Sequence, residues 1–354
     1  MPYPFEIETQ SRELARAIQS ILDNKTKPPG SLGQLEHLAR RIAGLQKSLT
    51  PTLGRLAHLV FAAEHGVCDQ GISPYPREVT RQMVLNFMSG GAAINVFCRQ
   101  HDVDLTVVDA GLTGDPLPEH PALVNARVSS GSRDFTTGPA MTTEEIDRAL
   151  LAGAEIAKSK IQGGFSILSF GEMGIGNSTV SAALMAACLG LPPQDCVGVG
   201  TGADEEMIAR KVSVIEKALA LHGLRLDDGK AIMEHLGGLE LAMMAGAMGA
   251  TAEEGCPFLV DGFIASAALL TLWKDHPEIL DYAIFSHESD EAGHKALLRH
   301  LGVRPLLNLD LRLGEGTGAI LAWPLLQSAV AFFNEMASFE SAQVSNAPKN
   351  LAVN

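Results

Sequence analysis

The 354-residue sequence has few aromatic residues, and this shortage limits how it could bind other molecules. Phe, Tyr and Trp together make up 5% of the chain, with two tryptophans and three tyrosines. Aromatic platforms on which nucleic-acid bases stack are therefore not expected. Glycine is plentiful, with 35 residues, which favours closely packed helices and strands joined by glycine-rich loops.

Positive charge is also scarce. The chain has 27 Lys and Arg against 41 Asp and Glu, giving a formal net charge of −14, and no cluster of basic residues interrupts this balance. Nucleic acids and anionic membranes bind basic patches, so neither is an expected partner. A phosphate-bearing ligand would have to bind locally, through helix N-termini and a few cations.

Cysteines and long apolar segments are too few to support a disulfide framework, a secreted protein or a membrane protein. The five cysteines include no CxxC pair, and their odd number is typical of free thiols in a reducing compartment. The N-terminal segment lacks the apolar core of a signal peptide. The most apolar long segment, Pro257 to Trp273, contains Asp261 and is shorter than the ~20 residues that span a bilayer. A cytoplasmic protein is expected.

From about residue 55 onward, short apolar runs alternate with helical stretches. Because apolar residues make up 46% of the chain, a sizeable core is expected. Nearly continuous apolar runs are typical of strands buried on both faces, so the alternation predicts an α/β fold with a mostly parallel sheet. The expected strands are Leu56–Ala63, Leu105–Ala110, Phe165–Phe170, Phe258–Val260, Tyr282–Phe285 and Leu306–Leu309, and the expected helices are Thr143–Lys160, Ser178–Leu189, Glu205–His222 and Ile264–Trp273.

The two ends of the chain do not follow this alternation. Residues 7–48 have a helical, amphipathic pattern that is broken by Pro and Gly at 27–33, where Ser31 could cap the next helix. An apolar helix is expected over 319–336. We therefore predict a small helical domain made from residues 1–54 and 311–354, and a large α/β domain over 55–310.

Polar and glycine residues gather where the expected strands end, which is the edge at which open α/β sheets bind ligands. The strongest example is the loop 171–179, where three glycines precede Asn177, Ser178 and Thr179 at a helix start. Its free N–H groups and the helix dipole could bind an anion. The loop lacks the Gly-Lys-Ser/Thr ending of a P-loop, and its GxxGxG spacing does not fit a dinucleotide fingerprint. The alternative is a tight strand–helix turn with a polar cap.

A second candidate is Glu315, which lies between glycines in the segment 314–318. The flanking glycines have no side chains to pack against this carboxylate, so it is accessible. It could act as a general base if desolvation raises its pKa. The alternative is an acidic residue at a helix start that complements the helix dipole.

Two other segments are weaker candidates. Thr201, Gly202 and Lys211 could contact a phosphate, although the segment 201–211 is also an ordinary helix start. Asp109, near the end of the expected strand Leu105–Ala110, partly resembles the diphosphate-sugar motif of orotate-type phosphoribosyltransferases. That motif has two adjacent acids, and Ala110 replaces the second, which favours a plain strand end.

Metal-binding and covalent chemistry are poorly supported. His287, Glu288 and His294 have no recognised ligand spacing, and no HExxH is present. No GxSxG or Cys–His arrangement indicates a nucleophile. We expect no metal.

Five ordered motifs together resemble one family. The segments KPPGSLG (27–33), GEMGIGNST (171–179), GTGADEE (200–206), SHESDEAGH (286–294) and LRLGEGTGA (311–319) are similar to those of the nicotinate-nucleotide–dimethylbenzimidazole phosphoribosyltransferases, enzymes of cobalamin nucleotide-loop assembly. The resemblance covers residues ~5–345 and is far more specific than any single motif.

The resemblance implies a doubly wound, Rossmann-like α/β domain with a small helical domain, and a homodimer that needs no metal or cofactor. It implies transfer of the 5-phosphoribosyl group from nicotinate mononucleotide to 5,6-dimethylbenzimidazole, giving α-ribazole 5′-phosphate and nicotinate. Two departures are small: Ser178 replaces an expected Thr but keeps the hydroxyl, and Glu64 replaces an expected Asp, so Glu64 is assigned no role.

The resemblance also implies roles for individual residues. Glu315 falls on the family's catalytic base and on the benzimidazole site, where Ser73 and Gln82 are the other candidates. The candidates for holding the nucleotide are Glu172, Gly174, Gly176, Asn177, Ser178, Thr179, Thr201, Gly202, Lys211 and Ser289.

Two alternatives stay open. One is a Mg²⁺-dependent phosphoribosyltransferase that uses a diphosphate sugar, and the other is a non-catalytic nucleotide-binding protein. The sequence also leaves open which base is preferred and whether a second subunit completes the site.

Overall fold

The computed structural model describes residues 2–9, 12–198, 204–223 and 228–345. The chain divides into two compact units, one formed by Met1–Glu8 and Gly54–Ala322 and the other by Thr9–Leu53 and Trp323–Asn354. Among the described residues, no helix is both long and apolar enough to cross a membrane.

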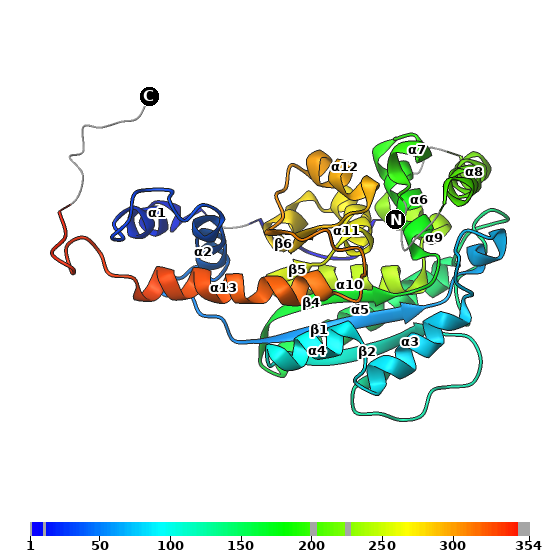
Figure 1. Ribbon diagram of the computed structural model, residues 1–354, viewed down its shortest axis with the longest axis horizontal. Helices are drawn as coiled ribbons and strands as arrows, with labels where there is room; N and C mark the ends of the chain where they lie inside the picture. The colour runs from blue at the N-terminus through cyan, green and yellow to red at the C-terminus, as the bar shows by residue number, and fades with distance from the viewer. Residues whose placement is uncertain (1, 10–11, 199–203, 224–227, 346–354) are drawn as a thin grey trace. The chain divides into compact units, whose positions relative to one another are not determined.

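The larger unit is built on a six-stranded sheet in which all the paired strands are parallel (Figure 1). The strand order is β3-β2-β1-β4-β5-β6, so the direction of winding reverses between β1 and β4. This is a doubly wound fold, as predicted, and ligands of such folds bind beyond the carboxyl ends of the strands at the reversal point. The strands are β1 (Arg55–Ala63), β2 (Asp104–Gly111), β3 (Leu123–Asn125), β4 (Phe165–Met173), β5 (Phe258–Val260) and β6 (Ala283–Phe285).

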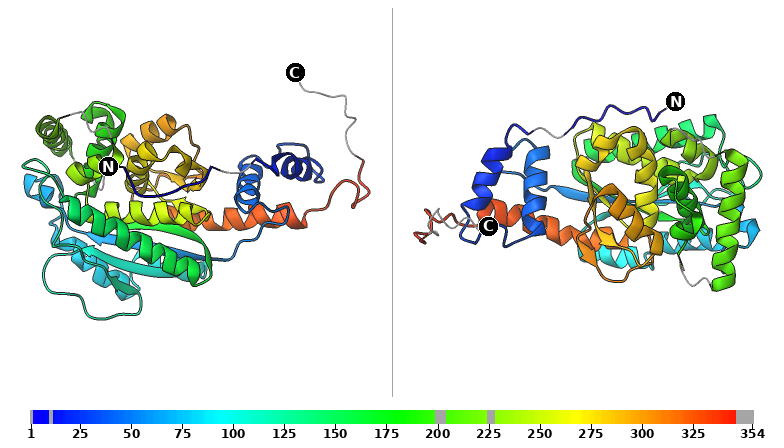
Figure 2. Two further views of the ribbon diagram at one scale, coloured as in Figure 1. Left: turned by 180° about the vertical axis from the view of Figure 1, so that it is seen from behind. Right: turned by 90° about the horizontal axis from the view of Figure 1, so that it is seen from above.

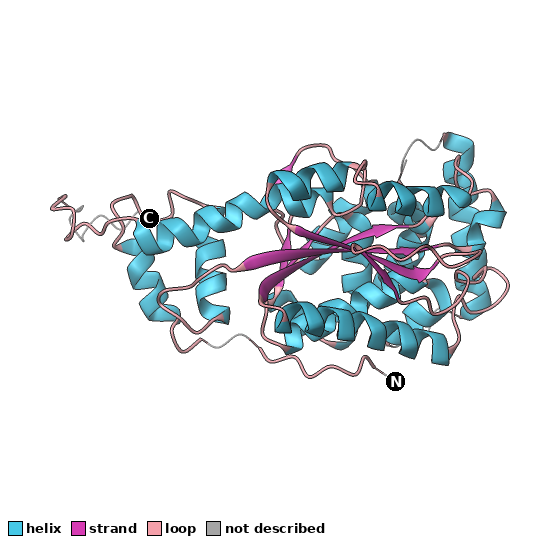
Figure 3. Ribbon diagram, turned by 90° about the horizontal axis from the view of Figure 1, so that it is seen from below, coloured by secondary structure: helices cyan, strands magenta, loops and turns pink. Residues whose placement is uncertain are grey.

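Helices cover both faces of this sheet (Figure 3). The predicted helices at α5, α6, α8 and α11 are confirmed to within two residues at each end, whereas α3, α4, α7, α9 and α12 were not anticipated. The helices of the larger unit are α3 (Glu78–Met88), α4 (Ala93–Gln100), α5 (Thr143–Gln162), α6 (Asn177–Leu189), α7 (Pro193–Cys196), α8 (Glu205–His222), α9 (Gly229–Leu236), α10 (Leu239–Glu253), α11 (Phe263–Asp275), α12 (Ala292–Leu301) and the start of α13 (Thr317–Glu335).

The core of the larger unit depends on apolar strands and on helices rich in small residues. Every residue of β1 after Arg55 is buried, and α10 is buried from its first residue to Ala252. Helix α5 approaches α10 so closely that a Cβ atom at Gly153 or Gly246 would overlap a backbone carbonyl of the other helix. Glycine at these positions therefore sets the distance between the two helices.

One predicted strand does not join the main sheet. The apolar run 306–309 contains β8 (Leu307–Asn308), which pairs in parallel with β7 (His287–Glu288) in a separate two-stranded sheet. Short apolar runs show where a strand forms but not which strand it pairs with, because pairing is decided by tertiary contacts.

The smaller unit is helical and draws on both ends of the chain, as Figure 2 shows for its blue and red segments. It contains α1 (Ala15–Asp23), α2 (Gln34–Leu45) and most of α13. The Asn334 side chain donates to the Pro51 carbonyl at 2.8 Å, and Lys25 donates to the Met336 carbonyl at 2.6 Å. Hydrogen bonds thus tie the N-terminal segment to the C-terminal one.

The predicted break between the first two helices is correct, but its predicted cap is wrong. The N-cap of α2 is Gly33, with φ of 53°, and no side chain caps it. Glu36 instead accepts hydrogen bonds from the Leu32 amide at 3.0 Å and from Lys27 at 2.7 Å. The turn lengthens the loop beyond Ser31, so that residue lies too early in the chain to cap the helix.

The unit bounds differ from the expected division at 1–54, 55–310 and 311–354. Tyr3 is buried in the larger unit and its hydroxyl lies 2.7 Å from the Thr271 hydroxyl, so the first residues pack there. Residues 311–322 also belong to the larger unit. Independent folding of the two parts stays a prediction.

Candidate active site

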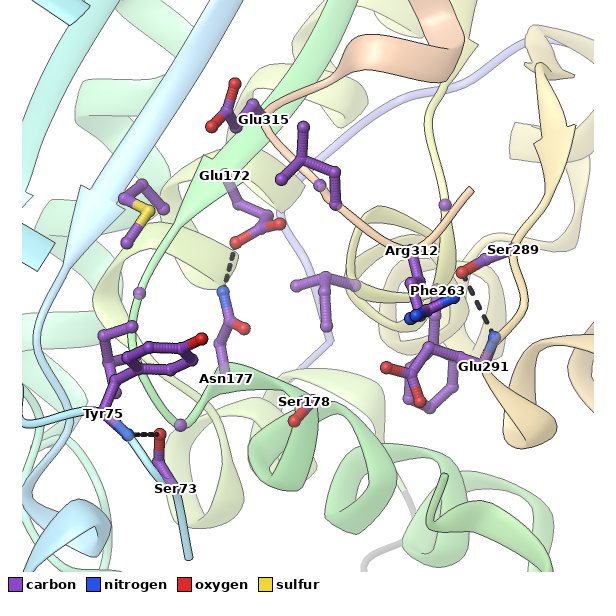
Figure 4. Close-up of a pocket in the computed structure, with 18 of the residues that line it drawn as sticks. Ser73, Tyr75, Glu172, Asn177, Ser178, Phe263, Ser289, Glu291, Arg312 and Glu315 are labelled. Atoms are coloured by element: carbon purple, nitrogen blue, oxygen red, sulfur yellow. Dashed lines mark hydrogen bonds between the residues drawn. The ribbon is translucent and has the colours of Figure 1, made fainter. Parts of the chain in front are cut away.

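A pocket of about 470 Å³ lies where the loops after β1, β4 and β5 leave the sheet (Figure 4). Its volume is in the range of sites for small organic ligands. Most of its lining comes from the segments after these strands, from α8, and from the turn before α13. The lining residues are Ile72, Ser73, Pro74, Tyr75, Val79, Met83, Glu172, Met173, Gly174, Ile175, Gly176, Asn177, Ser178, Lys211, Asp261, Gly262, Phe263, Ile264, His287, Ser289, Glu291, Arg312, Leu313, Gly314 and Glu315.

Glu315 projects from an unusual turn. Gly314, Glu315 and Gly316 have φ values of 86°, 63° and 86°, so three successive residues are in the left-handed region. Glycine adopts this region freely, but a residue with a side chain does so at an energetic cost. The Glu315 side chain is 5% exposed, and one carboxylate oxygen accepts a hydrogen bond from the Ile94 amide at 3.2 Å.

The surroundings of Glu315 suit a proton acceptor. Burial raises the pKa of the Glu315 carboxyl above its usual range, the Ile94 amide opposes this rise, and the negative charge of Asp261 adds to it. A carboxylate with a raised pKa is a stronger base than one in water.

A second buried carboxyl, Glu172, lies at the end of β4. Burial raises the pKa of Glu172 to about 8, against an opposing hydrogen bond from the Asn177 side-chain amide, and the acids Glu240, Asp261 and Glu315 raise it further. At neutral pH, Glu172 is therefore mostly a neutral carboxylic acid that can donate a hydrogen bond.

The other end of the pocket is suited to an anion. In Figure 4, Glu172 and Asn177 lie between Glu315 and Ser178, which is in the first turn of α6. Gly176 has φ of 94° just before this helix, and a Cβ atom there would lie 2.6 Å from the Cys68 sulfur. Because Gly176, Asn177 and Ser178 line the pocket, the N-terminus of α6 opens toward it with its positive dipole end.

A buried cation reinforces this end. Lys211 of α8 lines the pocket, is 5% exposed, and donates to the Ser178 hydroxyl at 3.3 Å. Burial lowers the pKa of Lys211, while the negative charge of Glu291 opposes that shift. An ammonium group beside a helix N-terminus is a typical binding site for a phosphate group.

The structure brings most of the sequence-predicted residues together. The predicted residues that line this pocket are Ser73, Glu172, Gly174, Gly176, Asn177, Ser178, Lys211, Ser289 and Glu315. Thr201 and Gly202 lie outside the described residues.

Two predicted residues are not brought to the pocket lining. Thr179 is buried in α6, and its hydroxyl oxygen has no hydrogen-bond partner among the described residues. Gln82 is exposed on α3, whereas the next residue, Met83, lines the pocket. Successive side chains of a helix point about 100° apart. A prediction that is wrong by one residue therefore selects a side chain on a different face of the helix.

Several lining residues were not assigned a binding role from the sequence. Among them, Asp261 follows β5, His287 lies in β7 and Arg312 precedes the Glu315 turn. The Asp-Gly pair that follows the apolar run 258–260 is the kind of strand-end signal that could have identified Asp261. The apolar wall is formed by Ile72, Pro74, Tyr75, Val79, Met83, Met173, Ile175, Phe263 and Ile264.

No group of three or more His, Cys, Asp or Glu side chains in the described part of the chain is arranged to hold a metal ion. The pocket combines four buried carboxyl residues, Glu172, Asp261, Glu291 and Glu315, with its anion-binding end and its apolar wall.

Comparison with known proteins identifies the family. A family model described as phosphoribosyltransferase matches residues 7–344. The nicotinate-nucleotide–dimethylbenzimidazole phosphoribosyltransferase of Cupriavidus necator is 51% identical over 350 residues, covering 98% of this chain and 99% of that protein. The corresponding enzyme of Photobacterium profundum is 47% identical over 340 residues, covering 96% and 99%.

A solved structure has the same fold. CobT from Thermus thermophilus is 47% identical and superposes with a TM-score of 0.91, covering 95% of this chain and 100% of that one. At these identities and coverages, the chain belongs to the nicotinate-nucleotide–dimethylbenzimidazole phosphoribosyltransferase family.

Proposed function

We propose that the protein transfers the 5-phosphoribosyl group of nicotinate mononucleotide to 5,6-dimethylbenzimidazole, giving α-ribazole 5′-phosphate and nicotinate. The observation that carries the proposal is one pocket that combines a buried base, Glu315, with the anion-binding end formed by Lys211 and Ser178. The first group suits the acceptor base and the second suits the substrate phosphate.

The chemistry needs a base and accurate positioning. The nicotinate leaving group is a pyridinium, so the C1′ carbon is already activated, and the transition state resembles an oxocarbenium ion. Attack by one nitrogen of the benzimidazole leaves a proton on the other nitrogen, and Glu315 accepts it. General-base assistance contributes ~10²–10⁴-fold. Holding two substrates in line contributes ~7–11 kcal/mol, so positioning outweighs the base.

The remaining lining supports this division of the pocket. Ile72, Val79 and Met83 offer an apolar wall to a planar, uncharged base, and Ser73 adds a hydroxyl at its edge. Glu172, kept neutral by burial, can donate to a ribose oxygen while Asn177 fixes its orientation.

The direct test is an assay with purified protein in EDTA. Nicotinate mononucleotide and 5,6-dimethylbenzimidazole are supplied, and nicotinate and the new nucleotide are followed by chromatography. Equimolar formation of both products supports the proposal. Product only with a diphosphate sugar and Mg²⁺ would indicate the metal-dependent reaction instead. Bound nucleotide without turnover, across a panel of bases, would indicate a binding protein.

The base assignment predicts the behaviour of Glu315→Gln. We expect kcat to fall by ~10²–10⁴-fold, because the proton acceptor is removed. Nucleotide affinity, measured by calorimetry, should stay within about twofold, because the phosphate binds at the other end of the pocket. The matched control is Glu335→Gln, because Glu335 is an exposed glutamate at the C-terminal end of α13. A near-normal kcat in Glu315→Gln would contradict the assignment.

The assignment of Glu315 as the base also predicts how activity depends on pH on the acidic side. A general base works only when deprotonated, so activity is lost as pH falls through the pKa of Glu315. Since that pKa is raised, the decline begins at a higher pH than for an ordinary glutamate near 4.5. The residual activity of Glu315→Gln should lack this decline.

We also propose that the protein is a cytoplasmic homodimer. The free cysteines of the described chain support a reducing compartment.

A further inference from the structure

Two fully buried polar residues lie behind the Glu315 turn without lining the pocket. His58 of β1 and Ser169 of β4 are both 0% exposed and stand opposite each other in the sheet register. The Nδ1 atom of His58 lies 2.7 Å from the Ser169 hydroxyl, and its Nε2 atom lies 2.9 Å from the Glu315 backbone carbonyl. The imidazole therefore bridges the central strands and the turn.

The chemistry of the two partners sets the tautomer of His58. The Glu315 carbonyl can only accept, so Nε2 carries the hydrogen and donates it. The Nδ1 atom is then unprotonated and accepts from the Ser169 hydroxyl. Burial lowers the pKa of His58 to about 4, so the ring stays neutral at the pH of the reaction.

The turn packs closely against His58 and against β4. A Cβ atom at Gly316 would overlap the His58 ring, and one at Gly171 of β4 would overlap the Glu315 carbonyl group. On the helix side, the buried Asp261 accepts a hydrogen bond from the Ala319 amide at 3.1 Å. The turn is thus held on both sides of Glu315.

These contacts are needed because the backbone of Glu315 is strained. A left-handed conformation at a residue with a side chain persists only when its surroundings enforce it. Releasing the carbonyl would let the residue relax toward negative φ and swing its carboxylate away from its present position.

We propose that His58, with its tautomer set by Ser169, is a positioning residue that places the Glu315 carboxylate by holding the Glu315 carbonyl. The inference rests on the proposed function, in which Glu315 is the base. It assigns a role in the reaction to two residues that touch no substrate.

The first test compares two substitutions of the same residue. In His58→Gln the side-chain amide reaches as far as Nε2 and can still donate to the Glu315 carbonyl. In His58→Asn the side chain is one bond shorter and reaches only the Ser169 side. We expect His58→Asn to lower kcat by roughly 10- to 100-fold, as for a displaced catalytic group. The KM for nicotinate mononucleotide should stay within about twofold, and His58→Gln should recover most of the rate.

Thr106→Val on β2 is the control, since Thr106 is also a buried polar strand residue and does not line the pocket. We expect it to leave kcat within about twofold. Equal losses in His58→Asn and His58→Gln, or a loss mainly in KM, would overturn the positioning role.

A double substitution separates positioning from general structural damage. If His58 acts through Glu315, then His58→Asn should slow a Glu315→Gln enzyme by less than about twofold, because no base is left to misplace. A full additional loss in the double variant would overturn the proposal. If His58→Asn is normal while Glu315→Gln is slow, the positioning role fails and the base assignment survives. A normal rate in Glu315→Gln would instead count against the base itself.

Two further measurements keep the test decisive if His58→Asn does not fold. Ser169→Ala removes the hydrogen bond that sets the His58 tautomer, and we expect kcat to fall roughly 2- to 10-fold. In ¹⁵N-labelled protein, the His58 ring should give the nitrogen shifts of a neutral ring protonated at Nε2. A ring protonated at Nδ1, or an unchanged kcat in Ser169→Ala, would overturn the proposal.

Discussion

At the scale of single residues, the site depends on two carboxyl groups with different surroundings. Glu315 accepts a hydrogen bond from a backbone amide, whereas Glu172 accepts one from the Asn177 side chain and lies near three other acids. Both pKa values are raised, and that of Glu172 reaches about 8. Such differences let neighbouring carboxyls serve as base and as neutral donor in one pocket.

The raised pKa of Glu172 predicts a pH-dependent effect on stability. The folded state holds the proton up to about pH 8, while the unfolded chain releases it near 4.5. This contribution is therefore fully present below pH 4.5 and is lost as pH rises through 8, by at most about 1.4 kcal/mol per pH unit. Glu172→Gln has no proton to lose.

Urea denaturation should show the consequence. Relative to the native protein, Glu172→Gln should gain stability as pH rises from 5 to 8, whereas the exposed control Glu335→Gln should show no trend. A stability difference that stays flat over this range would mean that Glu172 is ionised in the folded protein.

At the scale of elements, the close packing of α5 on α10 is a structural requirement apart from the site. Gly153→Ala would place a methyl group on the Met243 carbonyl of α10. Since backbone cannot move aside as a side chain can, we expect a loss of about 1–3 kcal/mol in the free energy of unfolding.

Gly138→Ala is the matched control, because nothing lies within 4 Å of a Cβ atom there. Chemical denaturation gives the stabilities, and kcat per folded molecule should be unchanged in both variants, since neither glycine lines the pocket. Equal stability of the two variants would show that α5 and α10 can separate without cost.

At the scale of the whole molecule, the proposed homodimer predicts a particle of twice the chain mass of 37.5 kDa, or about 75 kDa. Several large apolar side chains are exposed, including Leu85 of α3 and Val96 of α4, which is compatible with a covered surface. Sedimentation equilibrium measures the mass directly. A single-chain mass at micromolar concentration and above would contradict the homodimer.

The fold class and the ligand-binding edge follow from the amino-acid sequence alone. Continuous apolar runs such as 258–260 require burial on both faces, and this burial specifies parallel strands with their polar ends at one edge. Local rules also located the loop 171–179 and the glycine-flanked Glu315, because glycines and helix starts act over a few residues. The helix α3 was not expected from the sequence, and Met83 rather than the predicted Gln82 lines the pocket.

The way in which these residues act depends instead on tertiary contacts. His58 and Glu315 are 257 residues apart in the chain, and they meet because the turn at 314–316 packs against Gly171 of β4, the strand next to β1. The raised pKa of Glu172 arises mainly from burial, which cannot be predicted from the residues next to it in the sequence. Burial and long-range hydrogen bonds depend on which elements pack together, so they exist only once the chain has folded.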